Sequence, residues 1–177
     1  MWRACVLLLV ASLAFAGPIL IVNPGFETGD FTGWTRTGEL GFTSVTTTYA
    51  HSGTHSASFG PVGSLGYIAQ MIATTPGEAY DVSFLVHGSG TPNQIQLDWG
   101  GAEAATWTNV NAPSWTLFGW DGLVASSSTT ELKLGFRNDP SFLYVDDIEV
   151  NTAIPEPSTV LLVAAGAALL ALRRWLF

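Results

Sequence analysis

Residues that could carry catalysis are few in this sequence, and their spacing matches no familiar catalytic arrangement. Its three histidines are His51, His55 and His87, and it contains neither a Gly-x-Ser-x-Gly nor a His-Glu-x-x-His motif. Asp98 and Glu103 lie on either side of a glycine turn, but a glycosidase needs two carboxylates that face each other across a cleft. We therefore predict that the protein is not an enzyme. A small hydrolase is the alternative that two facing carboxylates would support.

His51 and His55 are four residues apart, which raises the question of a zinc site. That spacing brings two ligands together on a helix, whereas this segment reads as a loop that enters a strand. No neighbouring carboxylate completes a set of three or four zinc ligands. We interpret both histidines as surface residues.

Aromatic rings are the second group of candidate functional residues. Trp99, Trp107 and Trp115 lie near glycine-rich or proline-containing turns. Indole rings can stack on the apolar faces of sugars. The nearby polar side chains of Asn93, Gln96 and Asp98 could bond to sugar hydroxyls. We predict that the three tryptophans bind a ligand, with core packing as the alternative for each. Trp34, by contrast, is assigned to the core.

The region that must position these residues runs from Gly17 to Ile154 and is the size of one domain. It contains 13 acidic and 3 basic residues, a net charge near −10. Nucleic acid is excluded as a partner, because binding to phosphates needs clustered lysines and arginines. The only cysteine is Cys5, so the region can form no disulfide, cysteine nucleophile or thiolate metal site.

The N-terminus has the pattern of a secretory signal peptide over residues 1–16. Arg3 supplies a positive charge, an apolar run follows, and Ala14-Phe15-Ala16 offers small residues for a signal peptidase. The run is too short to span a membrane, which needs about 20 apolar residues. We predict cleavage between Ala16 and Gly17 and therefore export.

The C-terminal segment, residues 154–177, predicts a hydrophobic helix in the membrane. Pro155-Glu156-Pro157 precedes an uncharged, almost wholly apolar stretch, and Arg173 and Arg174 follow it. The stretch is marginal for a hydrocarbon core of about 30 Å, but tilt and snorkelling of the arginines could make up the difference. Positive charges stay on the cytoplasmic side, so the domain of residues 17–153 is expected outside.

This tail resembles the PEP-CTERM sorting signal, in which the three parts occur in the same order at the extreme C-terminus. The resemblance implies recognition by an exosortase-type enzyme and removal of the tail, with a permanent anchor as the alternative. It also implies a membrane-anchored protein, or one on the cell surface or in the extracellular matrix, of a Gram-negative-type bacterium that makes polysaccharide.

Alternation of apolar and polar residues predicts an all-β domain. Tyr80–Val86 and Glu131–Arg137 alternate clearly, and short turns rich in glycine and proline separate the strands. Further strands are expected at residues 19–22, 40–48, 55–59, 65–72, 94–99, 104–109, 116–123 and 142–150. Many short strands with regular turns favour a jelly roll, a form of β-sandwich.

Three segments resemble the galactose-binding-like jelly rolls that include several families of carbohydrate-binding modules. They are the opening Asn23–Trp34, the following His51–Ala57 and the closing Tyr144–Val150. The resemblance spans the whole domain. It implies the fold directly, and glycan binding only indirectly, because this fold also serves adhesive and structural roles.

The same resemblance implies a structural calcium ion held by Glu27, the backbone of His51 and Gly53, and Asp146. Calcium takes six to eight oxygen ligands and accepts backbone carbonyls. Asp146 is expected on the same face as Tyr144, Ile148 and Val150, where a carboxylate needs a partner. The alternative is that Glu27 caps a turn and Asp146 accepts backbone hydrogen bonds.

Taken together, these features predict an exported, surface-displayed, non-catalytic β-sandwich that binds extracellular polysaccharide. A structural or adhesive envelope protein without glycan specificity is the alternative.

Overall fold

The computed structural model describes residues 18–19 and 21–153, which belong to one compact unit, Gly17–Ala153. The predicted signal peptide and C-terminal helix lie outside the described residues. Within the described part every regular element is a strand, and no helix there is long and apolar enough to cross a membrane. The strands are β1 (Pro18–Ile19), β2 (Thr35–Gly38), β3 (Thr43–Thr46), β4 (Ser56–Phe59), β5 (Gly66–Ala73), β6 (Ala79–Gly88), β7 (Asn93–Trp99), β8 (Ala102–Thr108), β9 (Ala112–Val124), β10 (Thr129–Asn138) and β11 (Leu143–Thr152).

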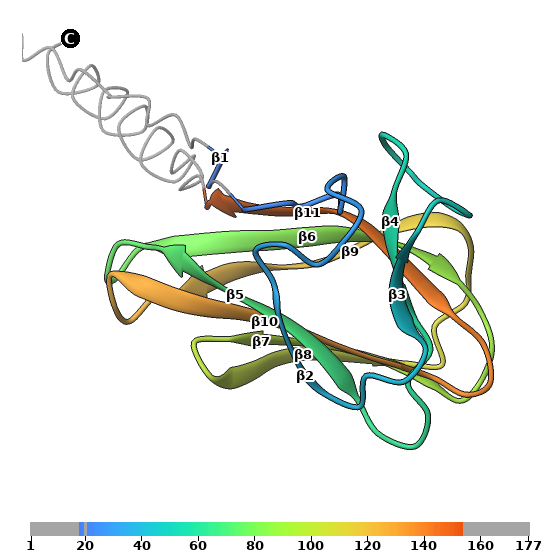
Figure 1. The fold of residues 1–177 in the computed structure, drawn as a ribbon. Coiled ribbons are helices and arrows are strands. Elements are labelled where there is room, and N and C mark those ends of the chain that lie inside the picture. Colours follow the sequence, from blue (N-terminus) through green and yellow to red (C-terminus); the bar gives the residue numbers. More distant parts are fainter. Residues whose placement is uncertain (1–17, 20, 154–177) are drawn as a thin grey trace, which may run out of the picture. The chain divides into compact units, whose positions relative to one another are not determined.

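Two antiparallel sheets form the two layers of a β-sandwich (Figure 1). The six-stranded sheet has the order β3-β4-β11-β6-β9, and the short β1 pairs with β11. The five-stranded sheet has the order β2-β5-β10-β7-β8. Neighbours in each sheet are mostly distant in sequence, so the jelly-roll prediction is confirmed.

The core lies between the sheets and follows the predicted alternation. On β6, Val82, Phe84 and Val86 are buried, while the residues between them are partly exposed. On β10, Leu132 and Leu134 are fully buried, while Lys133 lies on the outer face. Alternate side chains of a strand point to opposite faces, so each sheet has one apolar inner face and one outer face open to ligands.

One strand was not expected from the sequence. β2 has the sequence Thr-Arg-Thr-Gly and all four residues are exposed, so it lacks the alternation that marks a half-buried strand. It pairs only with β5, at the edge of the five-stranded sheet. Its strand conformation is therefore set by this pairing and not by burial of its side chains.

Candidate functional site

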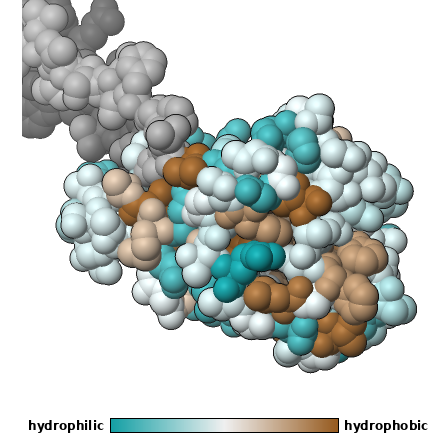
Figure 2. Space-filling model, in the orientation of Figure 1, coloured by the Kyte–Doolittle hydropathy of each residue, from teal (hydrophilic) through white to brown (hydrophobic). Residues whose placement is uncertain are grey.

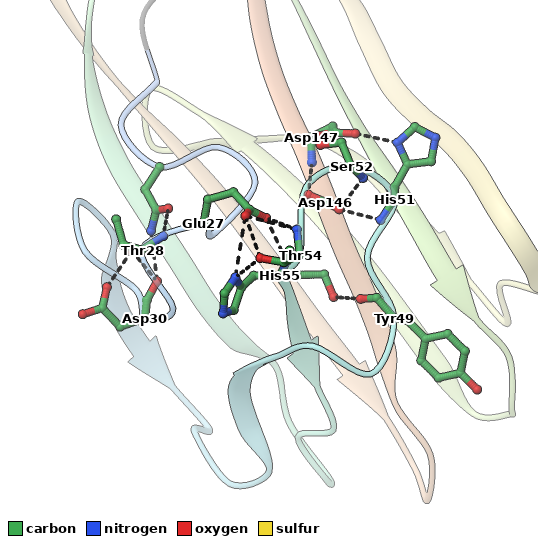
Figure 3. A network of polar contacts seen from close by, with 12 residues as sticks. Glu27, Thr28, Asp30, Tyr49, His51, Ser52, Thr54, His55, Asp146 and Asp147 are labelled. Carbon is green, nitrogen blue, oxygen red and sulfur yellow. Dashed lines mark hydrogen bonds and ion pairs between the residues drawn. The ribbon is translucent and has the colours of Figure 1, made fainter.

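The β3–β4 loop is held to the domain by carboxylates from two distant segments (Figure 3). From the opening segment, Glu27 accepts hydrogen bonds from the backbone N–H groups of Thr54, at 3.0 and 3.1 Å, and His55, at 2.8 Å. The Thr54 hydroxyl donates a further bond at 3.1 Å. The His55 and Thr54 backbone bonds lower the pKa of Glu27 below its ordinary value, because they stabilise the ionised carboxylate.

The second carboxylate comes from β11. Asp146 Oδ2 accepts the backbone N–H groups of His51, at 2.7 Å, and Ser52, at 3.2 Å. Asp146 Oδ1 accepts the backbone N–H of Asp147 at 2.8 Å. The side chain is fully buried, and this burial raises its pKa although the backbone bonds act in the opposite direction.

A β-bulge places Asp146 under this loop, which corrects its expected position. The register between β11 and β6 shifts between Asp146 and Glu149, and Asp147 has φ of 47°. The bulge reverses the alternation, so Val145 and Ile148 both face the core. Asp146 therefore does not share the face of Ile148. It pairs with Leu85 on the outer side of the sheet, where the loop covers it.

The two histidines of this loop bind different carboxylates. His51 Nδ1 lies 2.6 Å from Asp147 Oδ2, and Ser52 donates its hydroxyl to Asp147 Oδ1 at 2.5 Å. His55 Nδ1 lies 3.6 Å from Glu27 Oε2. Neither pair forms a zinc-type cluster. Within residues 18–19 and 21–153, no group of three or more His, Cys, Asp or Glu side chains is placed to hold a metal ion.

Two glycines leave space that the acidic residues of the predicted calcium site occupy. A Cβ on Gly53 would lie 2.5 Å from Glu27 Cδ, and Gly53 has φ of +60°. A Cβ on Gly25 would lie 3.1 Å from Asp146 Oδ1, 3.7 Å from Asp147 Oδ1 and 3.9 Å from Glu27 Cγ. Asp146 and Asp147 thus each direct a carboxylate oxygen toward the point above Gly25, whereas Glu27 presents its Cγ methylene group there and its carboxylate to Gly53. Carboxylate oxygens are ligands of the kind that calcium takes. In the structure, however, Glu27 and Asp146 accept backbone N–H groups of the β3–β4 loop, which is the alternative stated for both residues from the sequence.

The three tryptophans predicted to bind a ligand occupy different environments. Trp99 is only 7% exposed, packs against Tyr80 at 5.6 Å between ring centroids, and donates its indole N–H to Val124 O at 3.2 Å. It is a core residue, and its ring has no free face for a sugar. Trp34 is also a core residue, as predicted.

Trp107 and Trp115 are both half-buried, but only Trp115 lies on an outer face. Trp107, on the edge strand β8, packs against Phe84 and Phe118, with centroid distances of 6.1 and 5.6 Å. It closes the side of the sandwich where β8 and β9 meet. Trp115, on β9, contacts His51 and His87 on the outer side of the six-stranded sheet.

The outer face of the five-stranded sheet carries a candidate binding surface, of which the sequence indicated only Gln96 and Asp98. The ring of Tyr67 lies against Gly135 on the neighbouring strand, where a Cβ would be 2.6 Å from Tyr67 Cε1. Lys133 Nζ lies 4.3 Å from the centroid of the same ring and 3.6 Å from Asp98 Oδ2. Gln96 donates a 2.7 Å bond to the other oxygen of Asp98.

We call this the Tyr67 face. Its remaining members follow from the strand register, and all except Ala69 are polar: Thr35, Thr37, Ala69, Gln94, Glu103, Thr106, Thr108 and Arg137. Arg137 pairs with Asp139 at 2.5 Å, and Lys133 with Asp98, so the charges of the face are largely balanced. At one end, a hollow of about 340 Å³ adjoins it beside the register pair Met71 and Glu131, and four serine and threonine residues line this hollow. The face therefore offers a half-buried aromatic ring surrounded by hydrogen-bonding groups.

The Tyr67 face was missed because its members come from five strands. Alternation on β10 buries Leu132, Leu134 and Phe136. It therefore predicts that Lys133 and Gly135, which lie between them, point outward. Nothing in the sequence shows, however, that Gly135 lies beside Tyr67, because that neighbourhood depends on the register between β10 and β5.

The fold is a two-layer β-sandwich, and solved carbohydrate-binding modules share it. TmCBM61, solved with β-1,4-galactotriose, has a TM-score of 0.62 and 21% identity, over 74% of this chain and 96% of its own. A family 16 carbohydrate-binding module has a TM-score of 0.55 and 19% identity, over 74% and 98%. A family 35 module from Clostridium thermocellum has a TM-score of 0.55 and 13% identity, over 79% and 100%. At these identities the likeness shows the fold.

Family models identify the chain more closely. The model of the carbohydrate binding domain CBM_4_9 matches residues 19–120, more than half of the chain, and the protein belongs to this family. A model of the PEP-CTERM protein-sorting motif matches residues 153–174. Both resemblances drawn from the sequence are thus confirmed. No curated protein sequence matches the chain significantly.

Proposed function

We propose that this protein is a non-catalytic polysaccharide-binding protein displayed at the cell surface, and that it binds glycan on the Tyr67 face. The observation that carries the proposal is the Tyr67 ring, which lies against Gly135 beside Gln96, Asp98 and Lys133. An aromatic ring with adjacent polar groups suits a sugar, which has apolar C–H faces and hydroxyls at its rim.

The charges of the face favour a neutral glycan. Lys133 and Arg137 each have a carboxylate partner on or beside the face, so neither offers a free positive charge to an anionic sugar. The domain as a whole is strongly acidic, which would repel an anionic polymer unless a cation bridged the two. Paired charges can still donate and accept hydrogen bonds with hydroxyl groups.

A non-catalytic role fits the position of the two carboxylates considered for hydrolysis. Asp98 and Glu103 are register partners on the adjacent strands β7 and β8, so they are neighbours on one sheet face and do not oppose each other across a cleft. Asp98 is bonded to Lys133 and Gln96, and Glu103 accepts the Thr106 hydroxyl at 2.9 Å. This arrangement supports binding and not glycosidic bond cleavage.

We further propose that calcium binds between the opening segment and the β3–β4 loop. Glu27 and Asp146 would supply carboxylate oxygens, and His51 and Gly53 backbone carbonyls. The ion would neutralise acidic side chains that converge near Gly25 and would stabilise the loop. The approach of Asp146 Oδ1 and Asp147 Oδ1 to one point above Gly25, and of the Glu27 carboxylate to Gly53, supports this assignment.

The PEP-CTERM motif supports export and processing. We propose that the chain is cleaved after Ala16 and near Pro155–Pro157 by a signal peptidase and an exosortase-type enzyme, respectively. Intact-mass measurement of the protein from its native host tests both events. A mature protein that still carries residues 175–177 would indicate a permanent membrane anchor.

An adhesive role is the second candidate, because apolar side chains gather at one end of the domain. The exposed ones in the β2–β3, β4–β5 and β10–β11 loops are Leu40, Phe42, Val62 and Phe142, and Figure 2 shows hydrophobic surface at this end, at the lower right. Phe42 is 70% exposed. Exposed apolar groups of this kind favour contact with another surface.

Affinity electrophoresis of the full-length protein in detergent tests the proposed function. The gels contain soluble β-1,4-galactan, xylan or the extracellular polysaccharide of the native host. Retention by at least one polymer is expected, and Tyr67→Ala should weaken it about tenfold, whereas Tyr67→Phe, which keeps the ring, should change it little. If wild-type protein is retained by none of the three, the adhesive role takes first place.

A further inference from the structure

The outer face of the six-stranded sheet carries a second group of aromatic side chains, far from the Tyr67 face. Tyr144 on β11 is the register partner of His87 on β6. The His87 ring lies 5.6 Å from that of Trp115 on the adjacent strand β9, measured between centroids. The three half-buried rings thus form a row across three strands, on the side of the sheet away from the core.

The β3–β4 loop adds two rings to this row. Tyr49 stacks on His87, with centroids 4.6 Å apart and an interplanar angle of 23°, and lies 4.7 Å from Tyr144. His51 lies edge-on to Trp115 at 5.8 Å. Tyr49 is 44% exposed, so the assembled group presents aromatic surface to solvent. We call Tyr49, His51, His87, Trp115 and Tyr144 the aromatic surface.

Polar features of the aromatic surface suit a ligand with hydroxyl groups. His87 Nδ1 is buried and has no hydrogen-bond partner among the described residues. On the loop side of this surface, Asp147 holds both His51 and Ser52 by hydrogen bonds. A buried ring nitrogen without a partner is unfavourable, and a hydroxyl brought close by a small shift of Tyr49 would supply one.

The charges and the size of the surface select a neutral glycan as its occupant. The only lysines and arginines between residues 17 and 154 are Arg36, Lys133 and Arg137, and all lie on β2 and β10 of the other sheet. An anionic polymer would therefore meet no lysine or arginine here, and His51 is already paired with Asp147. A second protein copy would need roughly 20–30 residues per side, far more than five. Sugar rings need only a few aromatic side chains.

The two surfaces lie on opposite sides of the sandwich, since the inner faces of both sheets form one core about 10 Å thick. We propose that the aromatic surface is a second glycan-binding site, and that the domain therefore joins two polysaccharide chains. This inference rests on the proposed function and adds a second, independent site to it. A protein with both sites cross-links a polysaccharide, whereas a single site only attaches the protein to it.

The test compares Tyr67→Ala, Trp115→Ala and the double variant of the full-length protein, all in the same detergent. Each is run in affinity gels that contain β-1,4-galactan, xylan or the host polysaccharide. Dynamic light scattering then follows cross-linking of the polymer that retains the wild-type protein. Trp120→Ala is the matched control, because Trp120 lies on the same strand, is 47% exposed and is outside the aromatic surface. Trp115→Phe keeps a ring at the tested position.

Each single alanine variant should weaken retention about tenfold, and the double variant should abolish it. The wild-type protein should form large particles with the polymer, and neither single variant should do so. Trp120→Ala and Trp115→Phe should behave like the wild type. The variants should keep the wild-type melting temperature to within a few degrees, which separates loss of binding from loss of fold.

Other outcomes distinguish the two proposals. If Tyr67→Ala abolishes retention and Trp115→Ala leaves it unchanged, the second site is wrong and the proposed function stands. If only Trp115→Ala abolishes retention, the domain has one site, and both the two-chain inference and the Tyr67 assignment are wrong. If the wild type is retained but forms no large particles, cross-linking is overturned. Absence of wild-type retention overturns the proposed function itself.

Discussion

On the five-stranded sheet, the Tyr67 ring and its polar neighbours all come from strands, and backbone pairing fixes where they lie. On the six-stranded sheet, the row Tyr144, His87 and Trp115 is also fixed by strands, but Tyr49 and His51 come from a loop. That loop keeps its shape through Glu27, Asp146 and Asp147. One surface therefore depends on sheet register alone, and the other depends also on the carboxylates that anchor the β3–β4 loop.

This difference predicts that the two surfaces respond separately to changes at the carboxylates. Disturbing Glu27 or Asp146 should loosen Tyr49 and leave Tyr67 in place. Disturbing the core between the sheets should affect both surfaces together, because the core supports both sheets.

The largest effect is expected from Trp99→Ala, in the core shared by both surfaces. Removing this buried ring should lower the free energy of unfolding by about 3–5 kcal/mol. Trp120→Ala, which removes an exposed ring, should change it by roughly 0.5 kcal/mol or less. Denaturant melts of both variants measure the difference. Equal stabilities would show that Trp99 is not a core residue, and would restore it as a ligand-binding candidate.

Calcium should distinguish the two surfaces, because the proposed ion binds at the β3–β4 loop, which belongs to the aromatic surface and not to the Tyr67 face. An ion that binds the folded state alone stabilises it by mass action, about 2.7 kcal/mol at a concentration 100 times the dissociation constant. The melting temperature should therefore rise with added calcium and fall with a chelator. Glu27→Gln and Asp146→Asn should blunt this response, while Asp121→Asn, an exposed carboxylate elsewhere, should not. A melting temperature that ignores both calcium and chelator would remove the ion.

Asp146→Asn should also weaken the loop in the absence of calcium. The amide can keep one acceptor oxygen, but its NH2 group would then face donors that now bind Asp146, such as the N–H groups of His51 and Ser52. A loss of about 1–3 kcal/mol is expected. NMR signals of Tyr49 and Trp115 should shift and those of Tyr67 should not. Shifts of equal size on both faces would contradict separate control of the two surfaces.

The smallest effect is a pH dependence from Glu27. Its pKa in the folded protein is lowered below the ordinary value of 4.5, chiefly by the backbone N–H of His55 and then that of Thr54. Its stabilising contribution is therefore complete above about pH 4.5 and is lost as the pH falls through the folded-state pKa. Burial raises the pKa of Asp146, so its effect on stability has the opposite pH dependence. As the pH rises above 3.8, ionisation of Asp146 makes the folded state less stable.

Comparing the wild type with Glu27→Gln isolates the first contribution, because both proteins retain Asp146. The difference between their melting temperatures should be constant above about pH 5 and should shrink below pH 4.5. A difference that stays constant down to pH 3 would mean that Glu27 titrates as an ordinary exposed carboxylate.

The sequence by itself determined the fold class. Alternation on β6 and β10 places residues such as Phe84 and Leu134 in one apolar layer, and burying such layers requires two sheets packed face to face. Alternation on β7 could likewise have placed Trp99 in the core, because Ile95, Leu97 and Trp99 point to the same, buried face of that strand. The nearby Gly100-Gly101 turn suggested that Trp99 is exposed. The alternation of inward and outward side chains, however, continues to the last residue of β7, which is Trp99.

Tertiary structure decided the remaining features, because they depend on contacts between residues far apart in the chain. The exposed β2 is a strand only because it pairs with β5. The bulge at Asp147 moves Asp146 off the face that simple alternation predicts. Tyr67 contacts Gly135 because of the register between β5 and β10. Tyr49 contacts His87 because the β3–β4 loop folds over β6. Local pattern fixes which side of a strand a residue occupies, but only the pairing of strands decides its neighbours, and those neighbours form both surfaces.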